Sequence, residues 1–160
     1  MISKSITNYI IFNLILFITF SISVNSFVSI ENINVISYII FHISFIYFIF
    51  YFYHFSLFFI SFFYGVLFDI FLLNSVGAHL IIFLILTLLF IFFRKYLLLM
   101  SSYQIGILIY FVLIFIFFFE FILAYFLNNI FFNLFEFGKY TVISLIIFIP
   151  TIFFLNKFNK

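Results

Sequence analysis

The sequence consists of apolar runs that are each long enough to cross a lipid bilayer, separated by short polar stretches. A membrane-spanning helix needs about 20 mainly apolar residues, because each residue rises about 1.5 Å through a hydrocarbon core about 30 Å thick. Only 6% of the 160 residues are charged, which is too few to cover a water-soluble domain of this size. We therefore expect an all-α integral membrane protein without a soluble domain.

The polar stretches predict a single transmembrane domain of six helices joined by short loops. The expected spans are about residues 6–28, 35–53, 55–73, 78–93, 103–127 and 140–155. The boundary at His54 is the weakest, and one long span with a re-entrant piece over residues 35–73 would give five crossings. Residues 21–23 fit a signal-peptide cleavage site, but the same pattern describes a first membrane helix, and we expect an uncleaved helix.

The basic residues favour six crossings, because Lys and Arg gather in the cytoplasmic loops of membrane proteins. Six spans with a cytoplasmic N-terminus put five basic residues on the cytoplasmic side: Lys4, Arg94, Lys95, Lys157 and Lys160. Lys139 alone then lies outside, together with Glu31 and Glu136. Five crossings would separate Lys4 from the Arg94-Lys95 pair. We therefore expect both termini in the cytoplasm.

Several kinds of chemistry have no support in the sequence. The absence of cysteine excludes disulfides, thiolate metal ligands and thiol catalysis. The net charge of +2 does not suggest nucleic acid. Phosphate-binding loops, paired-histidine zinc motifs and serine-hydrolase elbows are missing, so we expect no enzyme activity, cofactor or metal. We interpret the 35 phenylalanines as drift on a permissive, lipid-facing surface.

Only a few side chains within the expected spans can ionise. They are Asp69, Glu120, His42 and His79. Such groups are costly in lipid and usually face a bundle interior, a cavity or a partner. Asp69, His79 and Glu120 all fall in the outer half of the bilayer, where they can form a buried polar cluster or remain separate acids near water. We expect His42 and His54 to be interfacial polar groups.

Ser61, Gly65 and Asp69 follow one another at intervals of four residues, so they share one face of the third helix. Small residues at this spacing let another helix approach closely. This stripe is therefore expected to be a packing surface with a polar anchor, and a ligand or proton site is the alternative.

The stretch between the fifth and sixth spans, residues 128–140, is unusually rich in aromatic side chains. It contains Phe131, Phe132, Leu134, Phe135 and Phe137, with Glu136 and Lys139 between them. We expect it to lie at the outer membrane interface, in contact with lipid or with a docked partner.

Residues 61–70, in which Gly65 precedes Asp69 by four, lead into Asn74-Ser75-Val76-Gly77-Ala78. This stretch resembles the region of MreD rod shape-determining proteins where a Gly-x-x-x-Asp helix enters a short turn with a second glycine. More loosely, the Arg94-Lys95 pair and the apolar helix bearing Glu120 also lie where that family has them. The specific part covers about twenty residues, and the proline expected at the start of the second span is missing.

The resemblance implies a non-enzymatic subunit of the bacterial elongation machinery in the cytoplasmic (inner) membrane. Its partners would be membrane lipids, an MreC-like bitopic protein and, through it, MreB, RodA and a class B penicillin-binding protein. The fold would be similar to that of the substrate-binding subunits of energy-coupling-factor transporters. Helix packing and partner recognition would then use four residues of the third helix and the turn after it: Ser61, Gly65, Asp69 and Gly77.

Two other functions stay open at the level of the sequence. A small-molecule-binding subunit of a transporter would need Asp69, His79 and Glu120 to converge on a cavity of a few hundred Å³. An intramembrane hydrolase would use Glu120 and His79, and stoichiometric zinc in the purified protein would favour it.

Overall fold

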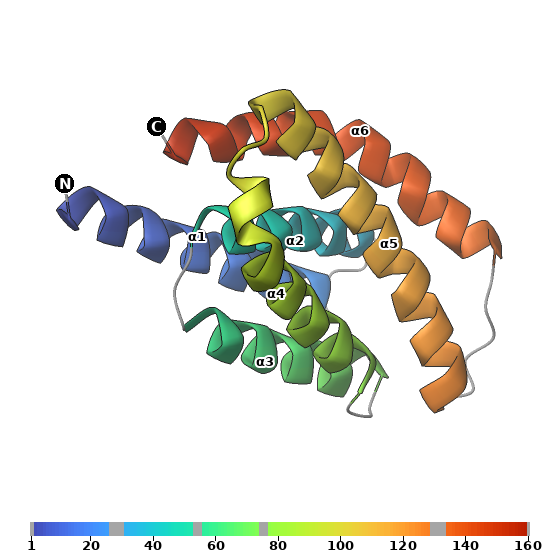
Figure 1. The fold of residues 1–160 in the computed structure, drawn as a ribbon. Coiled ribbons are helices and arrows are strands. Elements are labelled where there is room, and N and C mark those ends of the chain that lie inside the picture. Colours follow the sequence, from blue (N-terminus) through green and yellow to red (C-terminus); the bar gives the residue numbers. More distant parts are fainter. Residues whose placement is uncertain (1, 26–30, 53–55, 74–76, 129–133, 160) are drawn as a thin grey trace.

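The computed structural model is a bundle of six helices (Figure 1) and describes residues 2–25, 31–52, 56–73, 77–128 and 134–159. The helices are α1 (Ile2–Ser23), α2 (Glu31–Tyr51), α3 (Ser56–Phe68), α4 (Ala78–Leu97), α5 (Ser102–Asn128) and α6 (Leu134–Asn159). A π-helical turn, η1 (Asp69–Leu73), continues α3. No strand occurs in these ranges, so the expected all-helical architecture is confirmed.

Five helices, α2 to α6, are long and apolar enough to cross a membrane, which identifies a multi-pass membrane protein. The apolar part of α1, Thr7–Ser23, is shorter. α2 and the continuous α3–η1 segment are two separate spans, so the described part of residues 35–73 does not form one long helix. His54 itself lies outside the described residues.

Several helices extend beyond the apolar runs that predict them. α4 continues through Arg94 and Lys95 to Leu97, and α6 begins at Leu134 instead of near residue 140. Hydropathy marks where a helix leaves the hydrocarbon, and backbone hydrogen bonding can continue into the polar interface. The aromatic stretch from Leu134 to Tyr140 is therefore the beginning of α6, whereas Phe131 and Phe132 lie outside the described residues.

α2 is the central helix, and most of its apolar span is buried by its neighbours. The core is aromatic: Phe41 of α2 lies 4.7 Å from Phe68 and 6.1 Å from Phe83 between ring centroids. Phe12 of α1 stacks on Tyr47 at 5.5 Å. Among the described residues, ten phenylalanines are buried in this core: Phe12, Phe20, Phe41, Phe45, Phe48, Phe50, Phe68, Phe83, Phe90 and Phe117. Our interpretation of phenylalanine as a lipid-facing residue was therefore wrong for this set.

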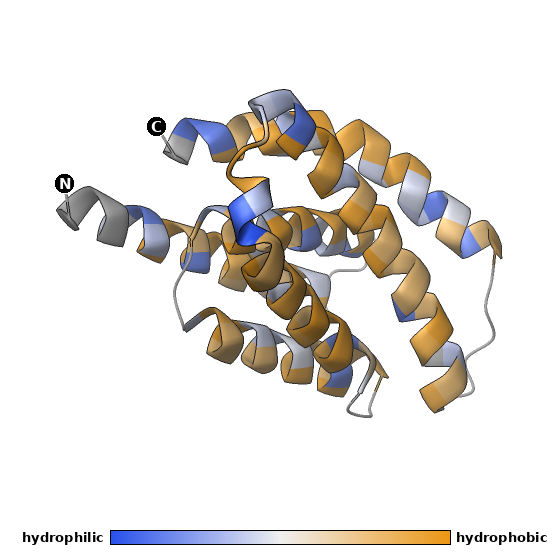
Figure 2. Ribbon diagram, in the orientation of Figure 1, coloured by the Kyte–Doolittle hydropathy of each residue, from blue (hydrophilic) through white to orange (hydrophobic). Residues whose placement is uncertain are grey.

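Many large apolar side chains are exposed on the outside of the bundle, and hydrophilic positions concentrate toward the helix ends (Figure 2). Both chain termini lie at one end of the bundle (Figure 1), which we call the terminal end. The last turns of α4 and α6, which carry Arg94, Lys95 and Lys157, lie at this end too. The opposite, distal end holds the starts of α2, α4 and α6.

Candidate functional site

Asp69 at the start of η1 caps the beginning of α4 through its carboxylate. The carboxylate accepts hydrogen bonds from the backbone N–H groups of Gly77 (2.6 Å), His79 (2.8 Å) and Leu80 (3.2 Å). Such N–H groups have no partner within their own helix, and a negative charge near them is favourable. Gly77 precedes α4 with a φ of 156°, a conformation that glycine adopts at low cost. One helix thus caps the next across a turn.

Gly65 brings the two helices close enough for this cap. A Cβ atom at Gly65 would lie 2.6 Å from Cα of Leu80, so no larger residue fits without separating α3 from α4. One turn earlier, Oγ of the buried Ser61 lies 2.6 Å from Oγ1 of Thr87. The stripe of Ser61, Gly65 and Asp69 therefore packs along α4 of the same chain.

This packing limits what the stripe can do for a partner protein. Ser61 and Asp69 have no exposed surface, and Gly65 is buried against α4. Gly77 lies at the start of α4, where its N–H group is bound to Asp69. A partner cannot contact Ser61 or Asp69 while the bundle is intact, so direct recognition requires another surface.

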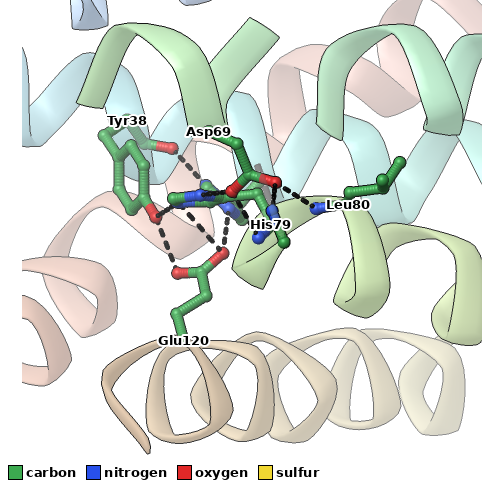
Figure 3. Close-up of polar contacts among 7 residues, drawn as sticks. Tyr38, Asp69, His79, Leu80 and Glu120 are labelled. Atoms are coloured by element: carbon green, nitrogen blue, oxygen red, sulfur yellow. Dashed lines mark hydrogen bonds and ion pairs between the residues drawn. The ribbon is translucent and has the colours of Figure 1, made fainter. Parts of the chain in front are cut away.

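Five side chains form one connected polar cluster: Tyr38, His42, Asp69, His79 and Glu120 (Figure 3). Nδ1 of His79 lies 2.9 Å from Oδ1 of Asp69, and Nε2 of His79 lies 3.0 Å from the Tyr38 hydroxyl. That hydroxyl lies 2.7 Å from Oε2 of Glu120. His42 lies 2.9 Å from Oε1 of Glu120 through Nε2 and 2.8 Å from the Tyr38 carbonyl through Nδ1. The cluster therefore ties α2, η1, α4 and α5 together.

The hydrogen bonds of the polar cluster require a definite number of hydrogen atoms. Each of these five bonds needs one hydrogen atom. Two neutral imidazoles and one hydroxyl supply three of these hydrogen atoms, so two further protons are needed to fill all five bonds. Filling every bond thus takes as many extra protons as the cluster has carboxyl groups, those of Asp69 and Glu120. The fully bonded cluster is thus neutral, as burial away from water favours.

A cavity of about 420 Å³ opens beside the polar cluster at the distal end, and we call it the distal cavity. Three members of the cluster line it: Tyr38, His79 and Glu120. The remaining wall comes from the ends of five helical segments: Ser23, Asn34, Val35, Leu72, Leu73, Phe117, Phe121, Glu136 and Tyr140. Asp69 does not line the cavity, but its carboxylate lies within hydrogen-bond distance of His79, which does. The three acidic and histidine candidates therefore lie together beside a cavity.

Two members of the polar cluster were not foreseen as site residues. We expected His42 to be interfacial, but this was wrong, because His42 is fully buried and bound to Glu120. Tyr38 was not a candidate, although it lies four residues before His42 and thus on the same face of α2. A histidine in the middle of an apolar run was the available signal, since such a group needs a partner in lipid.

The donor atoms of the polar cluster are turned toward one another. In the part of the chain that the structure describes, no group of three His, Asp or Glu side chains is arranged to hold a metal ion.

The comparisons with known proteins do not assign a function to this site. No protein family matches the chain; nor does any curated protein or solved structure.

Proposed function

We propose that this protein is a membrane scaffold subunit of the bacterial cell-elongation complex, which determines rod shape through peptidoglycan synthesis. It acts without enzymatic activity, by helix-to-helix recognition of partner membrane proteins. The observation that carries the proposal is the distribution of polarity: the polar cluster closes on itself inside the bundle, and the outer surface is mainly apolar. Such a surface is suited to contacts with other helices made within the membrane.

The resemblance of residues 61–78 to MreD supports the biological setting of this proposal. The protein would lie in the bacterial inner membrane with both termini in the cytoplasm, and α1 would complete six crossings. Basic residues in the last turns of α4 and α6 support this orientation, because both turns lie at the terminal end. The helical bundle is also compatible with the proposed similarity to energy-coupling-factor substrate-binding subunits.

We propose the groove between α4 and α5 as the surface that receives a partner helix. Ile81, Ile85, Leu89 and Phe93 repeat every four residues on α4, and each is between 40% and 50% exposed. Such a row is the ridge that a second helix packs against. The groove encloses about 720 Å³ and runs from Ile81 to Tyr96 along α4, a length of about 22 Å at 1.5 Å per residue. It can hold much of one membrane span.

The occupant that we propose is the membrane span of the MreC-like bitopic protein, through which the scaffold reaches MreB, RodA and the class B penicillin-binding protein. A photoreactive benzoylphenylalanine at Phe115, which lines the groove, should crosslink to this co-expressed protein. Phe17 on α1 is the matched control, because the two rings are 56% and 57% exposed. Equal crosslinking at both positions, or none at Phe115, would refute the docking site.

A cellular test addresses the function itself. In a rod-shaped bacterium that lacks its own MreD, the chain together with its bitopic partner should restore rod shape, and Asp69→Leu should fail to do so. Immunoblots of membranes then separate loss of the protein from loss of partner capture. If Asp69→Leu accumulates normally and supports rod shape, the importance of Asp69 is disproved. If the unaltered chain accumulates and cells stay round, the scaffold proposal fails.

A second candidate function, a small-molecule-binding membrane subunit, is favoured by one observation. Tyr38, His79 and Glu120 converge on the distal cavity, whose volume lies within the range of about 300 to 1,000 Å³ typical of ligand sites. A transport or sensing role would require saturable binding there.

A further inference from the structure

We propose that the terminal end of the bundle binds an anionic phospholipid, with its phosphate in a cavity between α2, α5 and α6 and an acyl chain in a groove between α5 and α6. This inference goes beyond both candidate functions and depends on neither of them. The residues that carry it line neither the distal cavity nor the groove between α4 and α5.

The cavity at this end, which we call the terminal cavity, has a volume of about 420 Å³. It lies between the start of α5 and the last turns of α6, which come together at the terminal end (Figure 1). The polar part of its wall consists of Tyr47, Tyr51, Ser102, Asn156 and Lys157. Ser102, Asn156 and Lys157 are exposed, so a ligand can reach them from the membrane interface.

The exposed polar groups of this wall can all donate hydrogen bonds. Oδ1 of Asn156 accepts a hydrogen bond from the Tyr47 hydroxyl at 2.8 Å, which leaves the amide nitrogen of Asn156 as the group that can bind a ligand. The Ser102 hydroxyl and the Lys157 ammonium group can donate as well. A ligand that satisfies three donors, one of them charged, must bring several acceptor oxygens and a negative charge, as a phosphate group does.

The distribution of charge favours an anionic lipid over a zwitterionic one. Lys157 is the one charged side chain among the described residues of the wall. All four acidic side chains of the sequence lie elsewhere: Glu31 and Glu136 in the first turns of α2 and α6, and Asp69 and Glu120 in the polar cluster. A phosphate diester therefore meets a positive charge in this cavity. The ammonium group of a zwitterionic lipid would find no carboxylate there to pair with.

An apolar groove between α5 and α6 continues from the terminal cavity toward the middle of the membrane. Cavity and groove adjoin at Ser102 and Gly106, where a Cβ atom on Gly106 would meet nothing from the surrounding chain within 4 Å. Ile107 and Phe111 line the groove opposite Ile149 of α6, and it encloses about 480 Å³. From Ser102 to Phe111 it extends about 14 Å, at about 1.5 Å per residue. This surface suits an acyl chain, which a soluble phosphate compound lacks.

The test measures which lipid lies in the groove of the full chain, reconstituted in nanodiscs. The chain has no tryptophan, so Tyr103→Trp places a single fluorophore in the groove. Brominated lipids, diluted in phosphatidylcholine, quench this fluorophore on contact. Phe92→Trp is the matched control, because Tyr103 and Phe92 are 78% and 79% exposed and Phe92 lies outside the groove, beside Arg94 and Lys95.

We expect phosphatidylglycerol to be enriched over phosphatidylethanolamine about fivefold more at Tyr103→Trp than at Phe92→Trp, the effect of one lysine near a phosphate. In the Tyr103→Trp background, Lys157→Gln should abolish this enrichment. Lys95→Gln should leave it unchanged, because Lys95 is an exposed lysine in the last turn of α4, outside the cavity.

Gly106→Leu provides a second test, because its side chain would fill the space where the cavity and the groove adjoin. Leucine is a better helix former than glycine, so α5 should be kept while the enrichment is lost. Equal quenching by brominated phosphatidylcholine in every variant shows that the tryptophan is still exposed to lipid.

Three results would overturn the proposal. Equal enrichment at the two tryptophan positions would mean that basic residues attract anionic lipids in general. An enrichment that survives Lys157→Gln or Gly106→Leu would show that the phosphate does not lie in the terminal cavity. If soluble glycerol 3-phosphate removes the enrichment, the ligand is a free phosphate compound and the assignment to a lipid is wrong.

Discussion

Replacing Asp69 with leucine removes the acceptor of four hydrogen bonds while keeping a side chain of similar length. Three of the donors are the backbone N–H groups of Gly77, His79 and Leu80, and the fourth is Nδ1 of His79. Asp69 has no exposed surface, so water cannot take its place without opening the bundle.

The cost can be estimated in two ways that agree. Polar side-chain interactions in membrane proteins contribute about 0.6 kcal/mol on average and about 1.7 kcal/mol at most, so four bonds give about 2 to 7 kcal/mol. Removing one partner of a buried ion pair costs about 3 to 5 kcal/mol. We therefore expect Asp69→Leu to lower the free energy of unfolding by about 3 to 5 kcal/mol. Asp69→Asn keeps one acceptor oxygen and should lose less.

The assay is an unfolding titration with dodecyl sulfate in mixed micelles. Helices persist in this detergent, so far-ultraviolet dichroism is a poor probe of tertiary packing. The chain has 11 tyrosines and no tryptophan, and the near-ultraviolet dichroism of the tyrosine rings reports the loss of the aromatic core. An Asp69→Leu curve with the same midpoint and slope as the unaltered protein would refute the idea that this carboxylate holds α4 to η1.

Three further predictions use the same titration. Gly65→Ala places a Cβ atom 2.6 Å from Cα of Leu80 and should lower the free energy of unfolding by about 1 to 3 kcal/mol. Unchanged stability would mean that α3 and α4 separate freely. Thr87→Val should lower the free energy of unfolding by under about 1 kcal/mol, because two hydroxyl hydrogens serve three contacts there. A loss as large as that of Asp69→Leu would contradict this expectation. Glu120→Leu and His42→Leu should couple by about 1 to 3 kcal/mol in a double-mutant cycle, whereas additive losses would show that the pair shares no bond.

The sequence was sufficient to predict the helical architecture because lipid leaves few alternatives. A backbone in hydrocarbon has to satisfy its own hydrogen bonds, so each apolar run of span length becomes a helix. The ends of the helices were less predictable. Glu31 begins α2, and α6 starts at Leu134, because a helix can continue after its side chains become polar.

The candidate site could be predicted in part. Asp69 and His79 flank one turn at the same end of the bundle. Because consecutive helices run in opposite directions, the part of the fifth helix that carries Glu120 lies toward that end too. The cap that Asp69 places on α4 was hidden, since its partners are backbone N–H groups that carry no sequence signal. His42 was missed because it was judged as a single interfacial group, although it needed a partner in lipid, and Tyr38 was not considered.

The polar cluster also bears on the groove that we propose for the partner helix. In lipid, helices gain little from burying apolar surface against one another, so packing and polar contacts decide their arrangement. His79 belongs to α4 and Glu120 to α5, and these two helices form the walls of the proposed groove. Both walls are thus anchored through one cluster to the central helix α2. A substitution that breaks the cluster should therefore weaken partner capture without touching the partner, which is why crosslinking at Phe115 has to be compared between variants at equal amounts of folded protein.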